Sequence, residues 1–288
     1  MTIRSRRWGP PPEGLRDPRT KGDWARLYVN SALDAREGPS FEDLRHFALF
    51  IGYARSGHTL VGTMLNAHPE VVIAHERDAV GIVRHRFSRR QLYALLLQRD
   101  QQFGTIGRSW SGYQYEIPGQ FQGRFECLRV IGDKRARSSV LQIARDPKLL
   151  DRLRTRVGVP IRVLHVTRNP FDNIATEARR HKLSLTEATG WYEDICRAIE
   201  QVRPLLDPSE LLDVRYETFV ADTAPALSDL CRFIGVVPGA PYLEACAGIV
   251  WPSTNRSRDA VEWTDSERQG VERLIENYEV LNSYSFDE

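Results

Sequence analysis

The sequence predicts a three-layer α/β fold with a parallel central sheet and helices on both faces. Residues 47–51 and 161–167 are largely apolar, as expected of strands that are buried on both faces. Residues 210–214 indicate a further strand, and a helix-forming segment follows each of the three. Strands that alternate with helices favour a parallel sheet that is covered on both sides.

The first quarter of the chain contains one complete strand–loop–helix unit. Residues 1–22 are rich in Pro, Gly and charge, so we expect them to wrap the surface or to be mobile. Helical spacing follows over residues 23–35. The strand at 47–51 runs into a glycine-rich loop, which leads to a helix over residues 58–67 and a second strand, Val71–Ala74.

The middle of the chain is less regular. Residues 81–127 contain one amphipathic helix, near 91–99, and are expected to be an insertion. A short strand over 128–131 leads to a helical stretch that reaches about Val157. The strand at 161–167 then opens another helix, with Asn169 as N-cap and Pro170 at the first helical position.

Two capping boxes mark helix starts in the last third. Ser184 with Glu187 opens a helix, and Thr264 with Glu267 opens the last one. A further helix is expected over residues 219–234. The apolar faces of the two capped helices are predicted to comprise Trp191, Ile195, Ala198, Ile199 and Val202 in the first, and Val271, Leu274, Ile275 and Tyr278 in the second. No repeat or linker divides the chain, so we expect one domain over 47–288 preceded by an extension, 1–46.

Composition argues against a nucleic-acid partner. The 40 Lys and Arg residues nearly balance the 38 Asp and Glu residues, whereas nucleic-acid-binding proteins have a larger basic excess or a basic stripe. Small arginine groups at Arg84–Arg90 and Arg152–Arg156 are interpreted as solvated helix faces.

Cysteine usage and hydropathy indicate a reducing, cytoplasmic location. The four cysteines lie within apolar runs without CxxC spacing, which favours buried free thiols. No stretch has the length and apolar character of a membrane span, and the N-terminus lacks the apolar core of a secretory signal.

The segment Gly52-x-x-x-x-Gly57-His58-Thr59 has the frame of a nucleotide phosphate loop. A glycine-rich turn that feeds a helix N-terminus offers backbone N–H groups to an anion, which predicts a P-loop-like nucleotide-binding architecture. His58 replaces the lysine of a Walker loop, so nucleoside-triphosphate chemistry is disfavoured. Arg55 supplies a cation three positions earlier, and its planar guanidinium suits phosphate or sulfate.

These residues resemble the PAPS-dependent sulfotransferases, which use 3′-phosphoadenosine 5′-phosphosulfate. The run Gly52-Tyr-Ala-Arg-Ser-Gly-His-Thr-Leu60 is similar to the 5′-phosphosulfate loop of bacterial members with Arg-Ser-Gly. The similarity continues through Met64–Pro69 to His75-Glu76. The resemblance implies PAPS as donor and PAP as product, with a sulfuryl acceptor that is a hydroxyl or an amine.

The resemblance also implies the rest of the cofactor site. The family pairs a strand-end Arg with a hydroxyl eight residues later, which Arg168 and Thr176 match. Tyr216 matches a tyrosine near the adenine, and the run Ser253–Arg258 resembles a loop that closes over the 3′-phosphate. The cofactor-binding residues are therefore predicted to be Arg55, Ser56, Gly57, His58, Thr59, Arg168, Thr176, Tyr216, Ser257 and Arg258.

Three residues are candidates for catalysis. Glu76 is expected at the carboxyl edge of the sheet and is the preferred base, with His75 as the alternative. Lys134 resembles a lysine that contacts the transferred group, although a surface salt bridge with Asp133 would explain it equally well. His58 either assists through its imidazole or serves as a helix cap.

Other functions remain as alternatives. The spacing of His68, His75, Glu76 and His85 matches no metal-site pattern, so no metal is expected. A nucleotide kinase or NTPase would need a loop lysine, and a Rossmann dehydrogenase would need GxGxxG; both are missing. A non-catalytic protein that binds PAP or another nucleotide would lack a base.

The acceptor is not specified by sequence. The aromatic segment Trp110–Phe121 is a candidate acceptor wall or lid, or simple packing, within the acceptor-side insertion 81–127. A small molecule and a glycan-like or lipid-like acceptor are all compatible with it. The oligomeric state is not readable.

Overall fold

The centre of the molecule is a five-stranded parallel sheet. The computed structural model describes residues 18, 20–37, 39–251 and 254–288. Its strands lie in the order β2–β5–β1–β6–β7. They are β1 (His46–Gly52), β2 (Val71–Ala74), β5 (Val130–Asp133), β6 (Ile161–Thr167) and β7 (Leu211–Arg215). Every adjacent pair is parallel, which confirms the predicted sheet.

The apolar strands form two cores because successive side chains point to opposite faces. On β1, Phe47, Leu49 and Ile51 belong to one apolar cluster. Ala48 and Phe50 belong to the other. A strand buried on both faces needs apolar residues at every position, which is the pattern the sequence carries.

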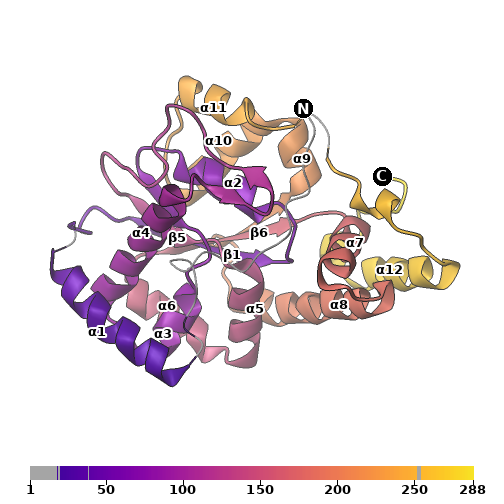
Figure 1. Cartoon of the computed structure of the whole chain (residues 1–288), viewed down its shortest axis with the longest axis horizontal. Helices are drawn as coiled ribbons and strands as arrows, with labels where there is room; N and C mark the ends of the chain where they lie inside the picture. The colour runs from indigo at the N-terminus through magenta and orange to yellow at the C-terminus, as the bar shows by residue number, and fades with distance from the viewer. Residues whose placement is uncertain (1–17, 19, 38, 252–253) are drawn as a thin grey trace.

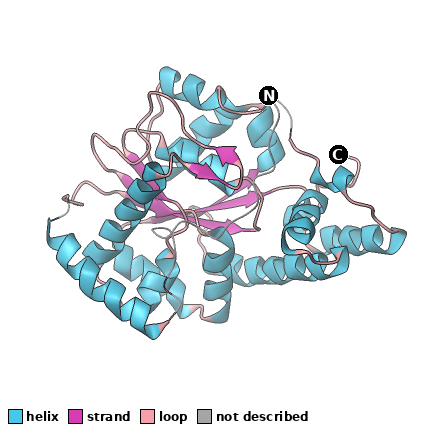
Figure 2. Ribbon diagram, in the orientation of Figure 1, coloured by secondary structure: helices cyan, strands magenta, loops and turns pink. Residues whose placement is uncertain are grey.

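Helices cover both faces of the sheet, as Figures 1 and 2 show. The side chains of α2, α10 and α11 join the Phe50 cluster, and those of α3, α5, α6, α8 and α12 join the Phe47 cluster. The three-layer, P-loop-like α/β fold is therefore confirmed. The described α-helices are α1 (Lys21–Glu37), α2 (His58–Asn66), α3 (Ala79–Arg84), α4 (Arg89–Thr105), α5 (Ala136–Arg145), α6 (Lys148–Val157), α7 (Pro170–His181), α8 (Leu185–Val202), α9 (Tyr216–Ala221), α10 (Thr223–Ile234), α11 (Ala240–Ala247) and α12 (Asp265–Asn277).

Several elements depart from the prediction. The helical stretch before Val157 is two helices, α5 and α6, because Pro147 interrupts it. The expected helix over 219–234 is likewise split, into α9 and α10. Trp191 was predicted to be part of a buried face and is 38 % exposed, while Tyr192 and Cys196 of α8 are buried instead.

The predicted helix starts and free cysteines can also be compared with the structure. Both predicted capping boxes are present. All four cysteines are free thiols, three of them buried and Cys127 half-buried. Most of the segment 1–22, and Ser253, lie outside the described residues. Among the described helices, none is long and apolar enough to cross a membrane.

The carboxyl ends of all five strands lie at one edge of the sheet, where the predicted site residues gather. Gly52 pairs with Val166, Thr167 pairs with Arg215, and Ala74 pairs with Asp133. The residues that follow these pairs are the glycine-rich loop, Arg168, Tyr216, Glu76 and Lys134. In open parallel sheets, ligands bind at this edge.

Candidate active site

The glycine-rich loop ends at the bare N-terminus of a buried helix. Gly57 caps α2 with a left-handed backbone (φ 90°), no side chain caps the helix, and its first turn carries no acid. Arg55 also has a left-handed backbone, with φ 68°. The first N–H groups of α2 have no intrahelical partners, so this end of the helix can bind an anion.

Gly57 is required because Tyr216 packs directly against it. A Cβ atom at Gly57 would lie 2.1 Å from a carbon of the Tyr216 ring. Tyr216 is the first residue of α9, directly after β7. Tyr216, at the end of β7, therefore covers the loop at the end of β1, and only a glycine at position 57 permits this contact.

Arg168 touches three of the other predicted motifs. Its Nη1 donates to the carbonyl of Arg55 at 3.3 Å, and its Nη2 donates to the carbonyl of Asn255. Its guanidinium carbon lies 5.6 Å from the centroid of the Tyr216 ring. The loop, the strand-end arginine, the tyrosine and the tail loop thus meet at one buried side chain.

Asp172 holds the tail loop against the helix that Arg168 precedes. Its carboxylate accepts the backbone N–H of Arg258 at 3.0 Å and lies 3.6 Å from Arg258 Nη1 and 3.7 Å from Arg168 Nη2. Ser257 and Arg258 are buried. The hydroxyl of Thr176 donates to the carbonyl of Asp172 at 2.7 Å, so it would need to rotate to bind a ligand.

Two residues of α7 that hold the loop in place were not predicted from the sequence. Asn173 Nδ2 donates to the buried Ser56 Oγ at 2.8 Å. Glu177 Oε1 lies 3.8 Å from Arg55 Nε. The signal was available: Asn173 and Glu177 follow Asn169 at four-residue intervals, which places all three on one helix face.

The side chain of His58 is part of the loop's support. Its Nε2 is 3.3 Å from the carbonyl of Ile51, and the ring is buried. Burial, and then the charge of Lys134, lower the pKa of His58 to about 3, so the imidazole is neutral and donates this bond. Gly57 is the cap of α2, so the interpretation of His58 as the cap is wrong. Only the backbone N–H of His58 is available to an anion.

At the other side of the loop, Lys134 connects the candidate base to α2. Its Nζ donates to Glu76 Oε1 and to Thr59 Oγ1, each at 2.9 Å. Asp133 is not its partner, because that carboxylate accepts the backbone N–H groups of Arg77 and Ala79. The alternative of a surface salt bridge between Lys134 and Asp133 is therefore wrong.

Glu76 is ionised and reachable, whereas His75 is enclosed. Burial acts to raise the pKa of Glu76, but Lys134 and then His75 lower it, with a net value of about 2. The Glu76 side chain is 42 % exposed. His75 is buried between Phe103, at 3.9 Å between ring centroids, and Trp110, at 4.6 Å. Burial keeps the pKa of His75 well below its usual value. The arrangement favours Glu76 as the group that an acceptor can meet.

A short hairpin lies beside the loop and the catalytic candidates. Its strands are β3 (Ser109–Trp110) and β4 (Tyr113–Gln114). Ser111 at its turn accepts a hydrogen bond from Arg55 Nη1 at 3.1 Å. Part of the aromatic segment 110–121 therefore borders the site, while Ile117 packs in the Phe50 core.

Part of the chain is similar to a known protein family. A family model described as the sulfotransferase family matches residues 160–237, which include Arg168, Thr176 and Tyr216. No curated protein sequence matches the chain.

Several solved structures with a similar fold are sulfotransferases. The sulfotransferase domain of the Synechococcus PCC 7002 olefin synthase is 16 % identical with a TM-score of 0.52, over 83 % of this chain and 96 % of that one. Sulfotransferase STF1 of Mycobacterium tuberculosis H37Rv is 12 % identical with a TM-score of 0.50, over 87 % of this chain and 80 % of that one. A mouse sulfotransferase, SULT7A1, solved with PAP, is 12 % identical with a TM-score of 0.44, over 88 % of each chain. The family match and the fold shared with the first two of these structures confirm the resemblance to sulfotransferases and the fold class.

Proposed function

We propose that this chain is a PAPS-dependent sulfotransferase that passes a sulfuryl group to an acceptor hydroxyl or amine. One observation carries the proposal: the guanidinium of Arg168 meets the loop at Arg55, the ring of Tyr216 and the tail loop at Asn255. Four segments far apart in the sequence converge in the manner that a doubly phosphorylated nucleotide requires.

The residues present fit such a nucleotide. The Nε atoms of Arg168 and Arg258 are buried and make no hydrogen bond within the described part of the chain. The Tyr216 ring packs against Gly57 and so lies beside the bare N-terminus of α2. We assign the loop amides and Arg55 to the 5′ end, Arg168, Thr176, Ser257 and Arg258 to the 3′-phosphate, and Tyr216 to the adenine.

PAPS, when bound, supplies an activated sulfuryl group joined to a phosphate leaving group. The work of the protein is alignment, neutralisation of charge and removal of a proton. Glu76 is ionised at neutral pH, so its carboxylate can accept the proton of the acceptor. Its low pKa results from Lys134. When Lys134 turns its ammonium toward a second anion, Glu76 becomes a stronger base.

Two other functions explain fewer features of the candidate active site. A kinase or NTPase needs a loop cation on the β- and γ-phosphates and a carboxylate for magnesium. His58 fills the position of that cation with its ring folded under the loop, and Asp133 is held by backbone N–H groups of the α3 start. A non-catalytic nucleotide-binding protein would have no use for the ionised Glu76–Lys134 pair.

A thermal-shift comparison tests the proposal. PAP, ADP, ATP and NAD are compared at matched concentrations, because a ligand that binds only the folded state raises its stability by mass action. We expect a clear rise of Tm with PAP and little with ADP, which lacks the 3′-phosphate. Equal shifts with PAP and ADP would remove the role of Arg168, and a shift with ATP alone would favour the kinase.

A further inference from the structure

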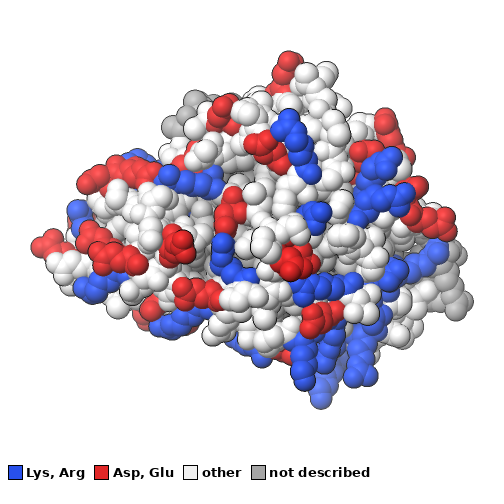
Figure 3. All heavy atoms as spheres, turned by 180° about the vertical axis from the view of Figure 1, so that it is seen from behind, with Lys and Arg blue, Asp and Glu red and all other residues white. Residues whose placement is uncertain are grey.

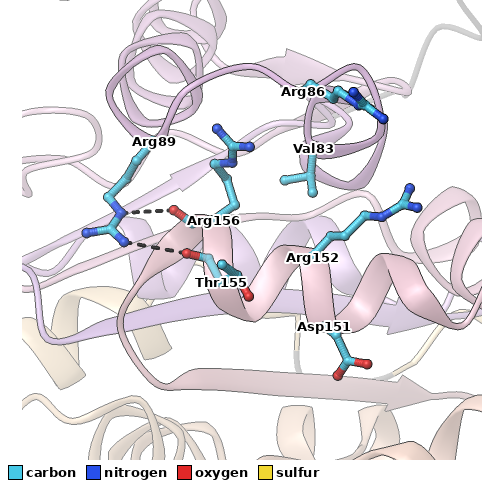
Figure 4. A pocket seen from close by; sticks show the side chains of 7 residues that line it. All are labelled: Val83, Arg86, Arg89, Asp151, Arg152, Thr155 and Arg156. Atoms are coloured by element: carbon cyan, nitrogen blue, oxygen red, sulfur yellow. Dashed lines mark hydrogen bonds between the residues drawn. The ribbon is translucent and has the colours of Figure 1, made fainter.

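An open hollow lies on the surface between the end of α3 and the side of α6, away from the candidate active site. We call it the arginine basin; it has a volume of about 660 Å³ and is lined by Val83, Arg86, Arg89, Asp151, Arg152, Thr155 and Arg156 (Figure 4). The arginine groups at Arg84–Arg90 and Arg152–Arg156 were predicted to be solvated helix faces. In the structure, residues of both groups line this one hollow. Arg86, Arg89 and Arg152 are exposed and Arg156 is half-buried, so the prediction of solvated faces is confirmed, and the two faces border one hollow.

The basin belongs to the opposite end of the molecule from the nucleotide site. Arg156 shortly precedes Ile161, the first residue of β6, whereas Arg168 follows the last residue of that strand. A strand of this length spans ~20 Å. Figure 3 shows Lys and Arg side chains gathered along the lower edge of the reverse face, where Figure 1 places α3 and α6.

The positive charge of the basin is poorly neutralised. Asp151 is its one acidic lining residue, and Asp151 pairs with Arg154 at 3.0 Å. Arg152 approaches Asp146 only to 3.8 Å. Within the described part of the chain, Arg86 and Arg156 form no ion pair. The dipole of α6 favours a cation at Arg156, but Arg86 and Arg89 come from another element.

Two of these arginines have a distinctive local geometry. Arg86 has a left-handed backbone (φ 63°) at the end of α3, where glycine or asparagine is the less strained residue. Arg89 Nε donates to the carbonyl of Arg156 at 2.9 Å, and a Cβ at Gly158 would lie 2.0 Å from the Arg89 guanidinium. This hydrogen bond holds Arg89 over the C-terminal end of α6 and links the two sides of the basin.

We infer that the arginine basin is a second anion site, for a soluble small molecule that carries at least two phosphate groups. Guanidinium groups bind phosphoryl oxygens in pairs, and several of them around one hollow fit a multiply charged phosphate better than a single carboxylate. The volume lies in the range of small-molecule sites. Val83 is the apolar residue among the seven that line the basin, and the aliphatic stems of the arginines add to its apolar wall.

Titration with inorganic tripolyphosphate at low salt tests this site by calorimetry. The test variant is Arg86→Gly with Arg156→Gln; glycine suits the left-handed backbone, so the variant should fold. Loss of two charge-assisted contacts should weaken binding on the order of 100-fold. The matched control, Arg26→Gln with Arg273→Gln, removes two exposed arginines from α1 and α12 and should bind as the unmodified protein does.

Two further measurements separate the possible sources of phosphate. Arg168→Ala should still bind tripolyphosphate at the arginine basin, whereas Arg86→Gly/Arg156→Gln should not. This result separates the basin from the nucleotide site, whether or not the proposed function holds. Vesicles containing phosphatidylglycerol should bind equally to the test and control variants. The inference is overturned if tripolyphosphate does not bind, if both double variants bind it equally, or if the test variant loses only vesicle binding.

Discussion

The two ends of the candidate active site are built differently. At the end that we propose binds the nucleotide, Gly57, Arg168, Tyr216 and Arg258 come from four chain segments and contact one another or share Asp172. At the end that we propose meets the acceptor, the Lys134 ammonium joins Thr59 to Glu76.

The contrast separates binding from turnover. The nucleotide end is buried and fixed by contacts that no single rotation can release, so substitutions there should affect ligand affinity and folding. The acceptor end depends on one ion pair between the buried Lys134 ammonium and the partly exposed Glu76 carboxylate, and a glutamine at position 76 would keep an oxygen acceptor for Lys134. Substitutions there should affect the chemical step and leave folding intact.

The largest effect is expected from Glu76→Gln. Loss of the base should lower kcat by about 10²–10⁴-fold, measured as sulfuryl transfer to an acceptor found by screening. PAP affinity should stay within about threefold, because Glu76 does not contact the loop amides. Glu70→Gln, at the other end of β2 and paired with Arg129, is the control and should be fully active. Unchanged turnover in Glu76→Gln would contradict the proposal that Glu76 is the base.

A smaller effect on folding is expected from Gly57→Ala at the nucleotide end. The added Cβ would meet the Tyr216 ring at 2.1 Å in a left-handed backbone. We expect the free energy of unfolding in urea to fall by about 2–4 kcal/mol. Gly190→Ala, in α8 with no heavy atom within 4 Å, should be neutral or stabilising. A Gly57→Ala protein as stable as its parent would show that the packing of Tyr216 on the loop is not required.

The smallest effect is a pH dependence that originates beneath the loop, between the two ends. The folded state holds the pKa of His58 at about 3, mainly by burial, against 6.5 in the unfolded chain. Below pH 6.5 only the unfolded chain takes up this proton, so the stability contributed by His58 is lost as pH falls from 6.5 toward 3. The loss amounts to about 1 kcal/mol per pH unit.

His58→Gln keeps an amide donor for the Ile51 carbonyl and does not titrate. Urea unfolding of both proteins between pH 4.5 and 7.5 should therefore give diverging curves, with the unmodified protein steeper. Asp133, whose pKa burial raises to about 6, acts in the opposite sense but is common to both proteins. Parallel curves would mean that the His58 imidazole is solvated.

Local sequence patterns predicted much of the fold and the strand ends at which the proposed nucleotide-binding residues lie. Apolar runs located β2 and β6 at their observed bounds, and the glycine pair of the loop located the start of α2. These features depend on neighbours in the chain, so a single sequence carries them. The same holds for Arg168, whose strand-end position follows from the strand that precedes it.

Contacts between distant segments could not be predicted in this way. The sequence left Lys134 open between Asp133 and a ligand; the structure pairs it with Glu76, because β2 and β5 are adjacent in the sheet. The convergence of Arg86 and Arg156 depends on the packing of α3 beside α6, which no local pattern encodes. Trp191 satisfied the helical periodicity of α8 but lies at the edge of the buried face.

The central claim is that Arg168 recognises the 3′-phosphate of the nucleotide, and calorimetry with PAP and ADP tests it directly. The unmodified protein should prefer PAP on the order of 100-fold. Arg168→Ala should reduce that preference to a few-fold, while Arg162→Ala, at the opposite end of β6 where its Nε donates to the Phe233 carbonyl, should keep it. A PAP preference that survives in Arg168→Ala would contradict the account.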